Sequence, residues 1–540
     1  MHISLIALFQ LTLVLSAVAT EPPDESRPER PTASTRTSDP LKASRVWERK
    51  HASHLLRRAG FGGTPEQVLY LKQLGRERAV EYLVNYREID AELPEPDVSE
   101  YEPRRPRDVM SMSEEERKKT FAERRRDDRV LFENVVGWWV DMMVSSPRPL
   151  EEKLTLFWHG HLTSGYREVK SAHAMLKQNR LLRHHASGNF RTLLLDITED
   201  PAMVLYLNTQ QNRKGMPNEN YARELLELFT MGTGNYTEQD IKEAARAFTG
   251  YTIDPRTGQV VFRPRLHDDG EKTFLGRTGA HEPADIIDII LEQPATAKFI
   301  ARKMWRFFAY DDPEDDIIDA LAKILRENQY EFKPMLRAMF KSDAFYSKRA
   351  MFTQIKSPTE LLVGCMRSLE IPAMDTATLN IGLRLMGQSL MQPPNVKGWD
   401  GQEAWITAST LFNRYNVLGG VIVGNDNDRA RRQRMRMIEA RRATTGREGN
   451  SADDDEGPRL QPAYDPLPAI RKFKLTNPER IVDHYVDRLL QRPLPRDRKQ
   501  VLIDAIRPSY ITKNPEAAQN VELIRGLVHM IVSMPEYQLE

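Results

Sequence analysis

Apolar residues recur along most of this chain at the spacing of α-helices. In residues 219–230, for example, Tyr221, Leu225, Leu228 and Phe229 follow the i, i+4, i+7, i+8 spacing that gathers side chains on one helix face. Comparable patterns predict helices over residues 131–144, 150–159, 170–186, 190–198, 201–207, 219–230, 238–249, 283–293, 295–309, 314–326, 332–340, 357–369, 376–386 and 402–420. So many amphipathic segments predict a mainly α protein.

One segment departs from the helical spacing. Residues 251–276 read YTIDPRTGQVVFRPRLHDDGEKTFLG and alternate around a Pro-Arg-Thr-Gly turn. Alternation of this kind is typical of a β-hairpin. The pattern therefore predicts a large multi-helix globular domain with one small β-hairpin insertion.

The N-terminus carries the pattern of a signal peptide. An apolar run from Ile3 to Leu15 is followed by Ala17-Val18-Ala19, which resembles a cleavage site. The run is shorter than the roughly 20 apolar residues that span a bilayer. We therefore expect residues 1–19 to be a signal peptide, the protein to be secreted or periplasmic, and no stable membrane span to remain after cleavage. An uncleaved anchor is the alternative.

Composition divides the rest of the chain. Residues 20–45 are rich in Pro, Ser, Thr, Glu and Arg and predict a disordered linker. Within the helical domain of residues 46–424, the charged excursion 97–129 has almost no apolar stripe, so it predicts a solvated helix or a mobile segment. Residues 425–465 combine an Arg-rich run with an acidic block and predict a disordered insert, and residues 466–540 complete the same domain.

Charge and cysteine content exclude several classes of protein. The 540 residues have a formal net charge of +1, so no overall field favours nucleic acid, and we expect no nucleic-acid partner. The single cysteine, Cys365, excludes an intrachain disulfide and zinc sites that need two or more cysteines.

Two histidines flank Gly160 in the segment FWHGHLTSG, at the end of a predicted helix. In a helix, residues two apart point about 200° away from each other, so His159 and His161 could share one metal ion only if the helix ended near Trp158. Gly160 permits such an end. The alternative is that each imidazole is a hydrogen-bonded residue of the core.

Polar residues run beside the apolar stripe of the 219–230 helix. Asn220, Arg223 and Glu224 lie on one flank, and Glu227 follows one turn after Glu224. This flank is either solvated and ion-paired, or it is a buried polar network or metal-ligand face.

Two loops carry further candidates. His267 and Asp268 follow the hairpin, where they form an Asx turn or present an imidazole and a carboxylate to a pocket. Trp399 and Trp405 either offer a stacking surface for sugars or aromatic compounds or fill the core.

Long stretches of the sequence resemble one bacterial family. These stretches include HLLRRAGFGGTPEQV, KLTLFWHGHLTSG, PNENYARELLELFTMG, HDDGEKTFLGRTG and GQSLMQPPNVKGWDG. From about Trp47 to Asn416, and again at MPEYQ, the chain resembles the domain of unknown function 1800 family, which is widespread in planctomycetes. The family commonly has Asn or another polar residue where this chain has Gly160.

The resemblance brings no agreed activity. It implies an exported, mostly helical protein, often encoded beside an exported sulfatase-like protein of the domain of unknown function 1501 family, which would be its partner. It also makes one shared pocket the working hypothesis, built from the 150–165 helix end, the 219–230 helix and the hairpin tip.

Three hypotheses for the function follow, and the third and weakest is carbohydrate binding through Trp399 and Trp405. In the first, the protein is a hydrolase or an oxidoreductase: His159 or His161 acts as base or ligand, Glu224 supplies a carboxylate, and Arg223 holds the substrate. A divalent metal would be bound by His161, Glu224, His267 and Asp268, and Asn220 and Trp399 would contact the substrate. In the second, the protein is a non-enzymatic envelope-assembly or export partner of the sulfatase-like protein, and the polar set, which also includes Asn218, is structural.

Overall fold

A computed structural model describes residues 39–91, 94–96, 98, 112–372, 374, 376–424, 464–510 and 514–540. The predicted signal peptide, nearly all of the charged insert and the first half of the charged excursion lie outside these residues. Residues Pro40–Glu540 form one compact unit. The last residues of the predicted linker belong to this unit. Ser44 N–H donates to Asp343 (3.0 Å), and the Lys42 carbonyl accepts from Asp343 N–H (2.8 Å).

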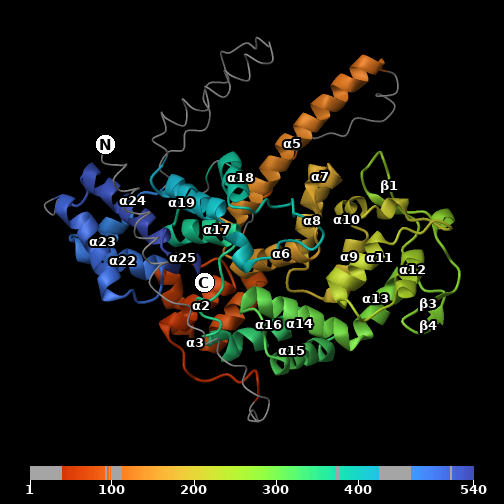
Figure 1. Ribbon diagram of the computed structural model, residues 1–540, viewed down its shortest axis with the longest axis horizontal. Coiled ribbons are helices and arrows are strands. Elements are labelled where there is room, and N and C mark those ends of the chain that lie inside the picture. Colours follow the sequence, from red (N-terminus) through yellow and green to blue (C-terminus); the bar gives the residue numbers. More distant parts are fainter. Residues whose placement is uncertain are drawn as a thin grey trace. The chain divides into compact units, whose positions relative to one another are not determined.

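The structure confirms a mainly α protein (Figure 1). The first ten helices described are α2 (Arg49–Arg58), α3 (Pro65–Val84), α5 (Glu114–Ser145), α6 (Pro149–His161), α7 (Tyr166–Val169), α8 (Ala172–His184), α9 (Phe190–Thr198), α10 (Pro201–Tyr206), α11 (Asn220–Glu224) and α12 (Glu238–Ala247). They are followed by α13 (Pro283–Glu292), α14 (Pro294–Phe308), α15 (Asp315–Glu327), α16 (Phe332–Lys341), α17 (Pro358–Leu369), α18 (Thr376–Leu385), α19 (Ala408–Ile422), α21 (Leu467–Phe473), α22 (Pro478–Leu489), α23 (Arg496–Ile506), α24 (Ala518–Val532) and α25 (Pro535–Gln538). Among the described residues, no helix is long and apolar enough to cross a membrane.

Local sequence signals explain where individual helices begin. Thr64 and Gln67 form a reciprocal capping box at the start of α3, with distances of 3.3 and 2.9 Å, and Pro65 occupies the first helical position. Ser357 and Glu360 cap α17 in the same way. The second of these caps also fixes a carboxylate that lines the cavity described below.

The β insertion consists of two antiparallel hairpins. Strand β1 (Tyr251–Ile253) pairs with β2 (Val260–Phe262), and Tyr251 lies opposite Phe262. Strand β3 (Lys272–Phe274) pairs with β4 (Arg277–Gly279), so the second hairpin extends three residues beyond the segment with the alternating pattern.

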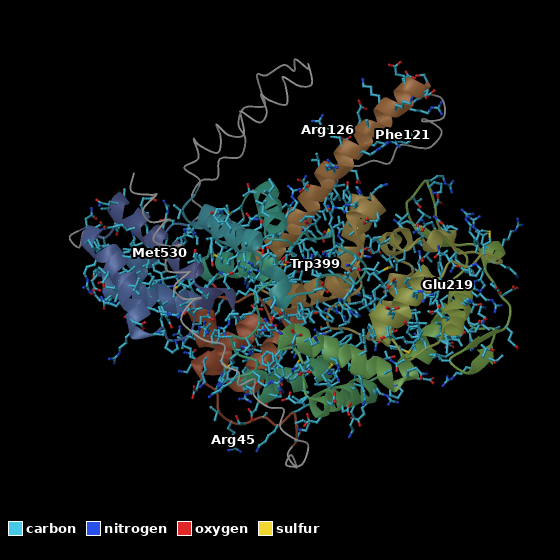
Figure 2. All side chains as sticks on the ribbon, in the orientation of Figure 1. Arg45, Phe121, Arg126, Glu219, Trp399 and Met530 are labelled. Carbon is cyan, nitrogen blue, oxygen red and sulfur yellow. The ribbon has the colours of Figure 1, made fainter. Side chains whose placement is uncertain are left out.

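Helix α5 joins a solvated half to a buried half. Its N-terminal half belongs to the charged excursion, and Figure 1 shows it extending beyond the neighbouring helices. Figure 2 labels Phe121 and Arg126 on this half. The C-terminal half carries the apolar pattern of residues 131–144 and packs Val135, Trp139 and Met143 into the core.

Helix α6 contributes to both apolar cores of the protein. Leu154, Phe157 and Trp158 belong to the cluster built mainly from α2, α3, α9 and α11–α16, whereas Leu156 belongs to the cluster of α5, α17–α19 and α21–α24. Every residue of α6 except Gly160 is buried. A helix buried on all sides directs side chains into both cores, which explains why the two histidines near its end meet different neighbours.

Candidate functional site

Helix α6 continues through His161, so the histidine pair lies on a helix and not on an extended segment. The Leu162 N–H donates to the Trp158 carbonyl (2.7 Å) and closes the last turn. The two imidazoles consequently point to different sides and have different partners. This is the geometry in which His159 and His161 do not share a metal ion.

His159 is held by the loop that follows α18. Its Nε2 accepts a hydrogen bond from the Met391 N–H (3.0 Å). Its ring lies 5.2 Å from Trp139 and 5.8 Å from Trp399, centroid to centroid. Burial lowers the pKa of His159 to about 4, so the ring is neutral near pH 7. His159 therefore fits the core alternative and supports Trp399 from behind.

His161 has one nitrogen fixed and one without a partner. Its Nε2 lies 2.9 Å from the Phe229 carbonyl, which can only accept, so Nε2 carries the proton. Phe229 belongs to η3 (Leu225–Thr230), a π-helical turn that follows α11, and its carbonyl lies where a helix leaves carbonyls unpaired. Nδ1 forms no hydrogen bond with the described residues. Burial, assisted by the charge of Lys303, lowers the pKa of His161 to about 3.

A cavity of about 320 Å³ opens beside His161. It is formed by the end of α6, one face of α14, the segment entering α17 and the loop that carries both predicted tryptophans; Figure 2 labels Trp399 in this loop. The lining residues are Leu156, Phe157, Gly160, His161, Lys303, Arg306, Phe307, Asp311, Gln354, Ile355, Ser357, Glu360, Gln388, Lys397, Trp399, Asp400, Gly401, Gln402 and Trp405. The structure thus brings together two of the predicted site segments, FWHGH and KGWDGQEAW.

A close backbone contact holds the tryptophan loop against α6. Gly398 has φ +84°, and a Cβ there would lie only 2.4 Å from the Gly160 carbonyl oxygen. Thr163 Oγ1 donates to the Val396 carbonyl (2.5 Å) and secures the same approach. Gly160 is different, because a Cβ there would meet nothing within 4 Å. Since Gly160 lines the cavity, a larger side chain at this position would fill it.

Three cations line the cavity, and two of them are paired with carboxylates. Arg306 Nε lies 2.7 Å from Asp311, and Lys397 Nζ lies 2.7 Å from Asp400. Among the described residues, no carboxylate pairs with Lys303. Burial, together with the nearby charges of Arg306 and Lys397, lowers the pKa of Lys303.

A buried ionic network forms the floor of the cavity. Lys153 Nζ contacts Glu360 at 2.5 Å and lies 3.9 Å from Glu540, and Arg58 also pairs with Glu540. Burial lowers the pKa of Lys153 to about 8; for Glu360, burial is outweighed by Lys153 and Arg58, so that its pKa falls to about 2. Both partners are therefore charged at neutral pH. Arg58 further bonds the Phe307 and Phe308 carbonyls at 2.6 and 2.9 Å and so ties the floor to α14.

The polar flank of α11 does not line this cavity. Arg223 pairs with Glu219 (3.1 Å) and Glu238 (2.8 Å), and its pKa is raised, mainly by Glu238. Asn220 N–H donates to Asn218 Oδ1 (3.0 Å) in a local turn. Burial and the neighbouring Glu227 raise the pKa of Glu224. The solvated, ion-paired alternative describes Arg223 well.

The residues after the first hairpin also have structural partners. His267 Nδ1 bonds the Thr249 carbonyl (2.9 Å), and its Nε2 lies 3.3 Å from Glu282. Asp268 accepts from Gly270 N–H (3.0 Å), as in an Asx turn, and pairs with Arg246 (2.8 Å), which lowers the Asp268 pKa to about 2. His267 and Asp268 are not among the cavity residues.

The predicted metal ligands therefore belong to separate contact sets. His161 faces the cavity, Asp268 faces Arg246, and His267 faces Glu282. Within the part of the chain that the structure describes, no group of three or more His, Cys, Asp or Glu side chains is arranged to hold a metal ion.

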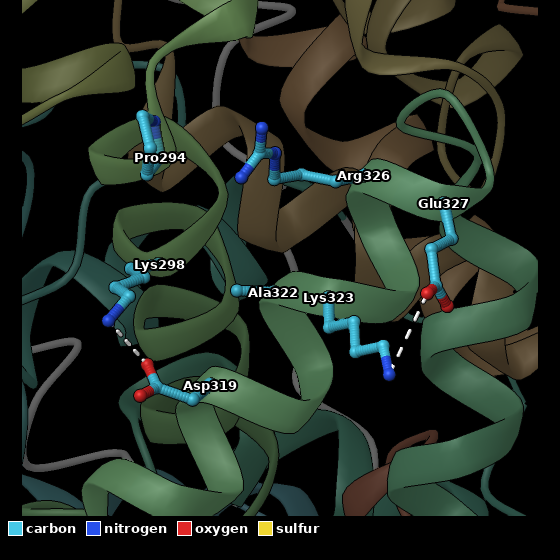
Figure 3. A pocket seen from close by; sticks show the side chains of 7 residues that line it. All are labelled: Pro294, Lys298, Asp319, Ala322, Lys323, Arg326 and Glu327. Carbon is cyan, nitrogen blue, oxygen red and sulfur yellow. Dashed lines mark ion pairs between the residues drawn. The ribbon is translucent and has the colours of Figure 1, made fainter.

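A second hollow lies on the surface between α14 and α15 (Figure 3). Its volume is about 510 Å³, larger than that of the His161 cavity. Lys298 pairs with Asp319 (2.7 Å) and Lys323 lies 3.8 Å from Glu327, and all four side chains are more than half exposed. These four charges are solvated and paired, Arg326 is the remaining charge in the lining, and no aromatic or histidine side chain lines the hollow, so the His161 cavity is the stronger candidate site.

Sequence reasoning did not find Lys303, Arg306, Gln354 or Glu360. Lys303 and Arg306 look like ordinary charges on the amphipathic helix PATAKFIARKMWRFF. Glu360 is visible in the sequence only as the third residue after a helix cap. Lys397 lies two residues before Trp399, and this proximity is the one sequence signal that could have identified Lys397.

The fold and the cavity define a class: a mainly α-helical protein with an open cavity that combines one histidine, two tryptophans and three cations. The chain belongs to the DUF1800 family of proteins of unknown function, which matches residues 54–539. No curated protein and no solved structure matches the chain.

Proposed function

We propose that the protein binds a small polar molecule in the His161 cavity and hydrolyses it, with His161 as proton acceptor. One observation carries this proposal: Nε2 of His161 is fixed by a carbonyl, while Nδ1 has no partner among the described residues and lies in a cavity of ligand size. Hydrogen bonding of one ring nitrogen sets the tautomer and leaves the other as the acceptor. A neutral imidazole in this state can take a proton from a water molecule that attacks the ligand.

The low pKa of His161 implies that the ligand carries a negative charge. A value of about 3 is too low for an efficient base, since catalytic pKa values lie near the working pH. Part of the lowering comes from the positive charge of Lys303. A negative charge bound near Lys303 would offset that field and raise the His161 pKa in the complex.

The two histidines of α6 provide a matched test. The purified exported chain would be assayed with a panel of nitrophenyl carboxylate, phosphate and sulfate esters and nitrophenyl glycosides. We expect hydrolysis of at least one class, a loss of 100-fold or more in His161→Gln, and a similar loss in Gly160→Leu, which fills the cavity. His159→Gln is the comparison variant: His159 lies on the same helix outside the cavity lining and reaches the cavity only through Trp399, so its loss of activity should be much smaller than that of His161→Gln.

Two results would contradict the proposal. The first is full activity in His161→Gln or in Gly160→Leu. The second is no hydrolysis of any ester or glycoside by wild-type protein whose folding has been verified by circular dichroism.

A second candidate function is suggested by α5. Phe121 is 45% exposed on the half of this helix that extends beyond its neighbours, and Val130, nine positions later, is 55% exposed. A partner that covers this helix would bury these apolar side chains. In this proposal, the chain assists envelope assembly or export outside the cytoplasm with an exported sulfatase-like protein of the domain of unknown function 1501 family.

Copurification tests this candidate. A tagged chain should retain the sulfatase-like protein from a periplasmic extract and lose it in Phe121→Ser/Val130→Ser. Phe412→Ser removes an aromatic side chain that is 63% exposed elsewhere and should retain the partner. Equal recovery by all three chains, or by none, would contradict it.

A further inference from the structure

We infer that the His161 cavity takes a ligand with an aromatic or pyranose ring and one anionic substituent, the anion against Lys303 and the ring against Trp399. This inference rests on the proposed function in one respect only, namely that the cavity is the binding site. It adds the chemical class of the ligand, on which the role of His161 does not depend.

The charges of the cavity leave one positive charge to be matched. Arg306 and Lys397 are each neutralised at 2.7 Å by a neighbouring aspartate. The third lining carboxylate, Glu360, is neutralised from below by Lys153. Lys303 remains, half-buried on α14, with the face of its own helix neighbour Phe299 as its nearest recorded contact, at 5.4 Å.

An ammonium group in this position favours an anion over water. Burying a charge without a partner is costly, and a carboxylate, sulfate or phosphate ester oxygen would supply the missing partner. Arg306 and Lys397 lie close enough to act on the Lys303 ammonium, while their own aspartates balance their charges. With two of the three cations already paired, the cavity matches one negative charge.

Two tryptophans belong to the lining of the same cavity. Trp399 is partly exposed, whereas Trp405 is only 7% exposed. The Trp399 ring is supported by His159 at 5.8 Å, and Gly398 fixes its loop against α6. A supported indole face is a platform for a flat aromatic ring or for the C–H face of a sugar.

The cavity has room for a ring with its substituent. A volume of about 320 Å³ lies at the small end of ligand cavities. The ligand class is therefore an aromatic or pyranose ring with one carboxylate or sulfate-type group. Benzoate, phenyl sulfate and glucuronate represent the three simplest members.

Calorimetric titration with matched probes tests the inference. Wild-type protein would be titrated with benzoate, phenyl sulfate and glucuronate, and with benzamide and glucose as neutral counterparts and benzylamine as a cation. We expect at least one anion to bind at least tenfold more tightly than its neutral counterpart, and benzylamine to bind more weakly still. The preferred anion then distinguishes a carboxylate from a sulfate group and an aromatic ring from a sugar.

Variants of Lys303 show whether this side chain causes the preference for anions. Lys303→Met should reduce anion affinity at least tenfold, and Lys303→Arg should restore most of it. Lys298→Met is the matched control, because it removes a lysine from the same helix outside the cavity and should change affinity less than threefold. Thermal unfolding verifies that each variant is folded. If Lys303→Met does not fold, the anion affinity of Lys303→Arg is compared with that of the wild type instead.

The outcomes separate this inference from the proposed hydrolase. The inference is overturned if neutral probes bind as tightly as anions, if no probe binds at millimolar concentration, or if Lys303→Met leaves the preference unchanged. His161→Gln should retain the anion preference while losing hydrolysis. Anion binding without any hydrolysis would remove the proposed activity and leave this ligand class standing.

Discussion

The His161 cavity and the polar surface of α11, α12 and the hairpins are both rich in charged residues, but they differ in how completely those residues are paired. On the surface, Arg223 has two carboxylate partners and Asp268 has an arginine and a backbone amide. In the cavity, Lys303 has no carboxylate partner and His161 Nδ1 has no hydrogen-bond partner among the described residues. The surface cluster therefore stabilises the fold, whereas the cavity contains a cation and a ring nitrogen that are available to bind a ligand.

This difference shows why residue type alone is a weak guide to a site. Asn220, Arg223, Glu224, His267 and Asp268 have the chemistry of ligands, and the partners identified for Arg223 and Asp268 occupy that chemistry. A polar group that is buried without a partner costs free energy, so its presence calls for an explanation such as a ligand. The predictions below test the two regions in order of expected effect.

The largest effect should come from the floor of the cavity. Lys153→Met leaves the Glu360 carboxylate buried without its main partner, and breaking a buried ion pair in this way costs about 3–5 kcal/mol. The midpoint of urea unfolding should fall accordingly. The double variant Lys153→Met/Glu360→Gln should recover most of the loss, because it leaves no unpaired charge. Equal stability of the single variant and the wild type would mean that the floor is not an ionic network.

A smaller effect concerns the pH dependence of stability. The pKa of His161 is lowered to about 3 in the folded protein, while the unfolded value is about 6.5. Below pH 6.5 the His161 side chain binds a proton in the unfolded chain but not in the folded protein. Its contribution to the free energy of unfolding is therefore present above pH 6.5 and is lost as pH falls toward 3. At pH 4.5 the loss is about 2–3 kcal/mol.

His161→Gln removes that contribution. The difference in unfolding free energy between wild type and variant should therefore shrink, or change sign, by this amount between pH 7.5 and 4.5. Urea titrations at four pH values measure it. A difference that stays constant with pH would show that His161 is not a buried neutral imidazole.

The smallest effect is expected at the surface cluster. Arg223 is 35% exposed on its side chain, and exposed ion pairs contribute about 0–1 kcal/mol. Arg223→Met should lower the melting temperature by no more than a few degrees and leave probe binding in the cavity unchanged. Loss of anion binding in this variant would contradict a purely structural role for the surface cluster and would support Arg223 as a substrate contact.

Much of the helical fold was predictable because it depends on neighbours in sequence. The predicted helix over residues 190–198 matches α9, and the capping box at Thr64 and Gln67 fixes the start of α3 as expected. Periodicity placed the start of α6 one residue too late and its end two residues too early, the latter because Gly160 resembles a helix end; the hydrogen bond from Leu162 N–H to the Trp158 carbonyl keeps the last turn helical. The charged residues 114–129 and the apolar residues 131–144 looked like separate elements, yet they form one helix, because the good helix formers of the first half continue the second.

The candidate site was predictable only in part. His161 and Trp399 were singled out by their local patterns, and the structure places both in one cavity. Their partners Lys303 and Glu360 lie 142 and 199 positions after His161 in the sequence and have no local pattern that marks them. Which charges meet depends on how α14 and α17 pack against α6.

The sequence by itself determined the helical class, the positions of most helices and the family membership, because each follows from the order and spacing of residues along the chain. It left the directions of His159 and His161 open, since Gly160 permits a helix end, and the structure decided them by continuing α6 through His161. Only the tertiary structure decided which polar groups are satisfied. It paired Arg223 and Asp268 with distant residues of opposite charge and left Lys303 and one nitrogen of His161 facing a cavity. Pairing is a property of positions in space, and residues far apart in the sequence become neighbours only when the two apolar cores assemble around α6.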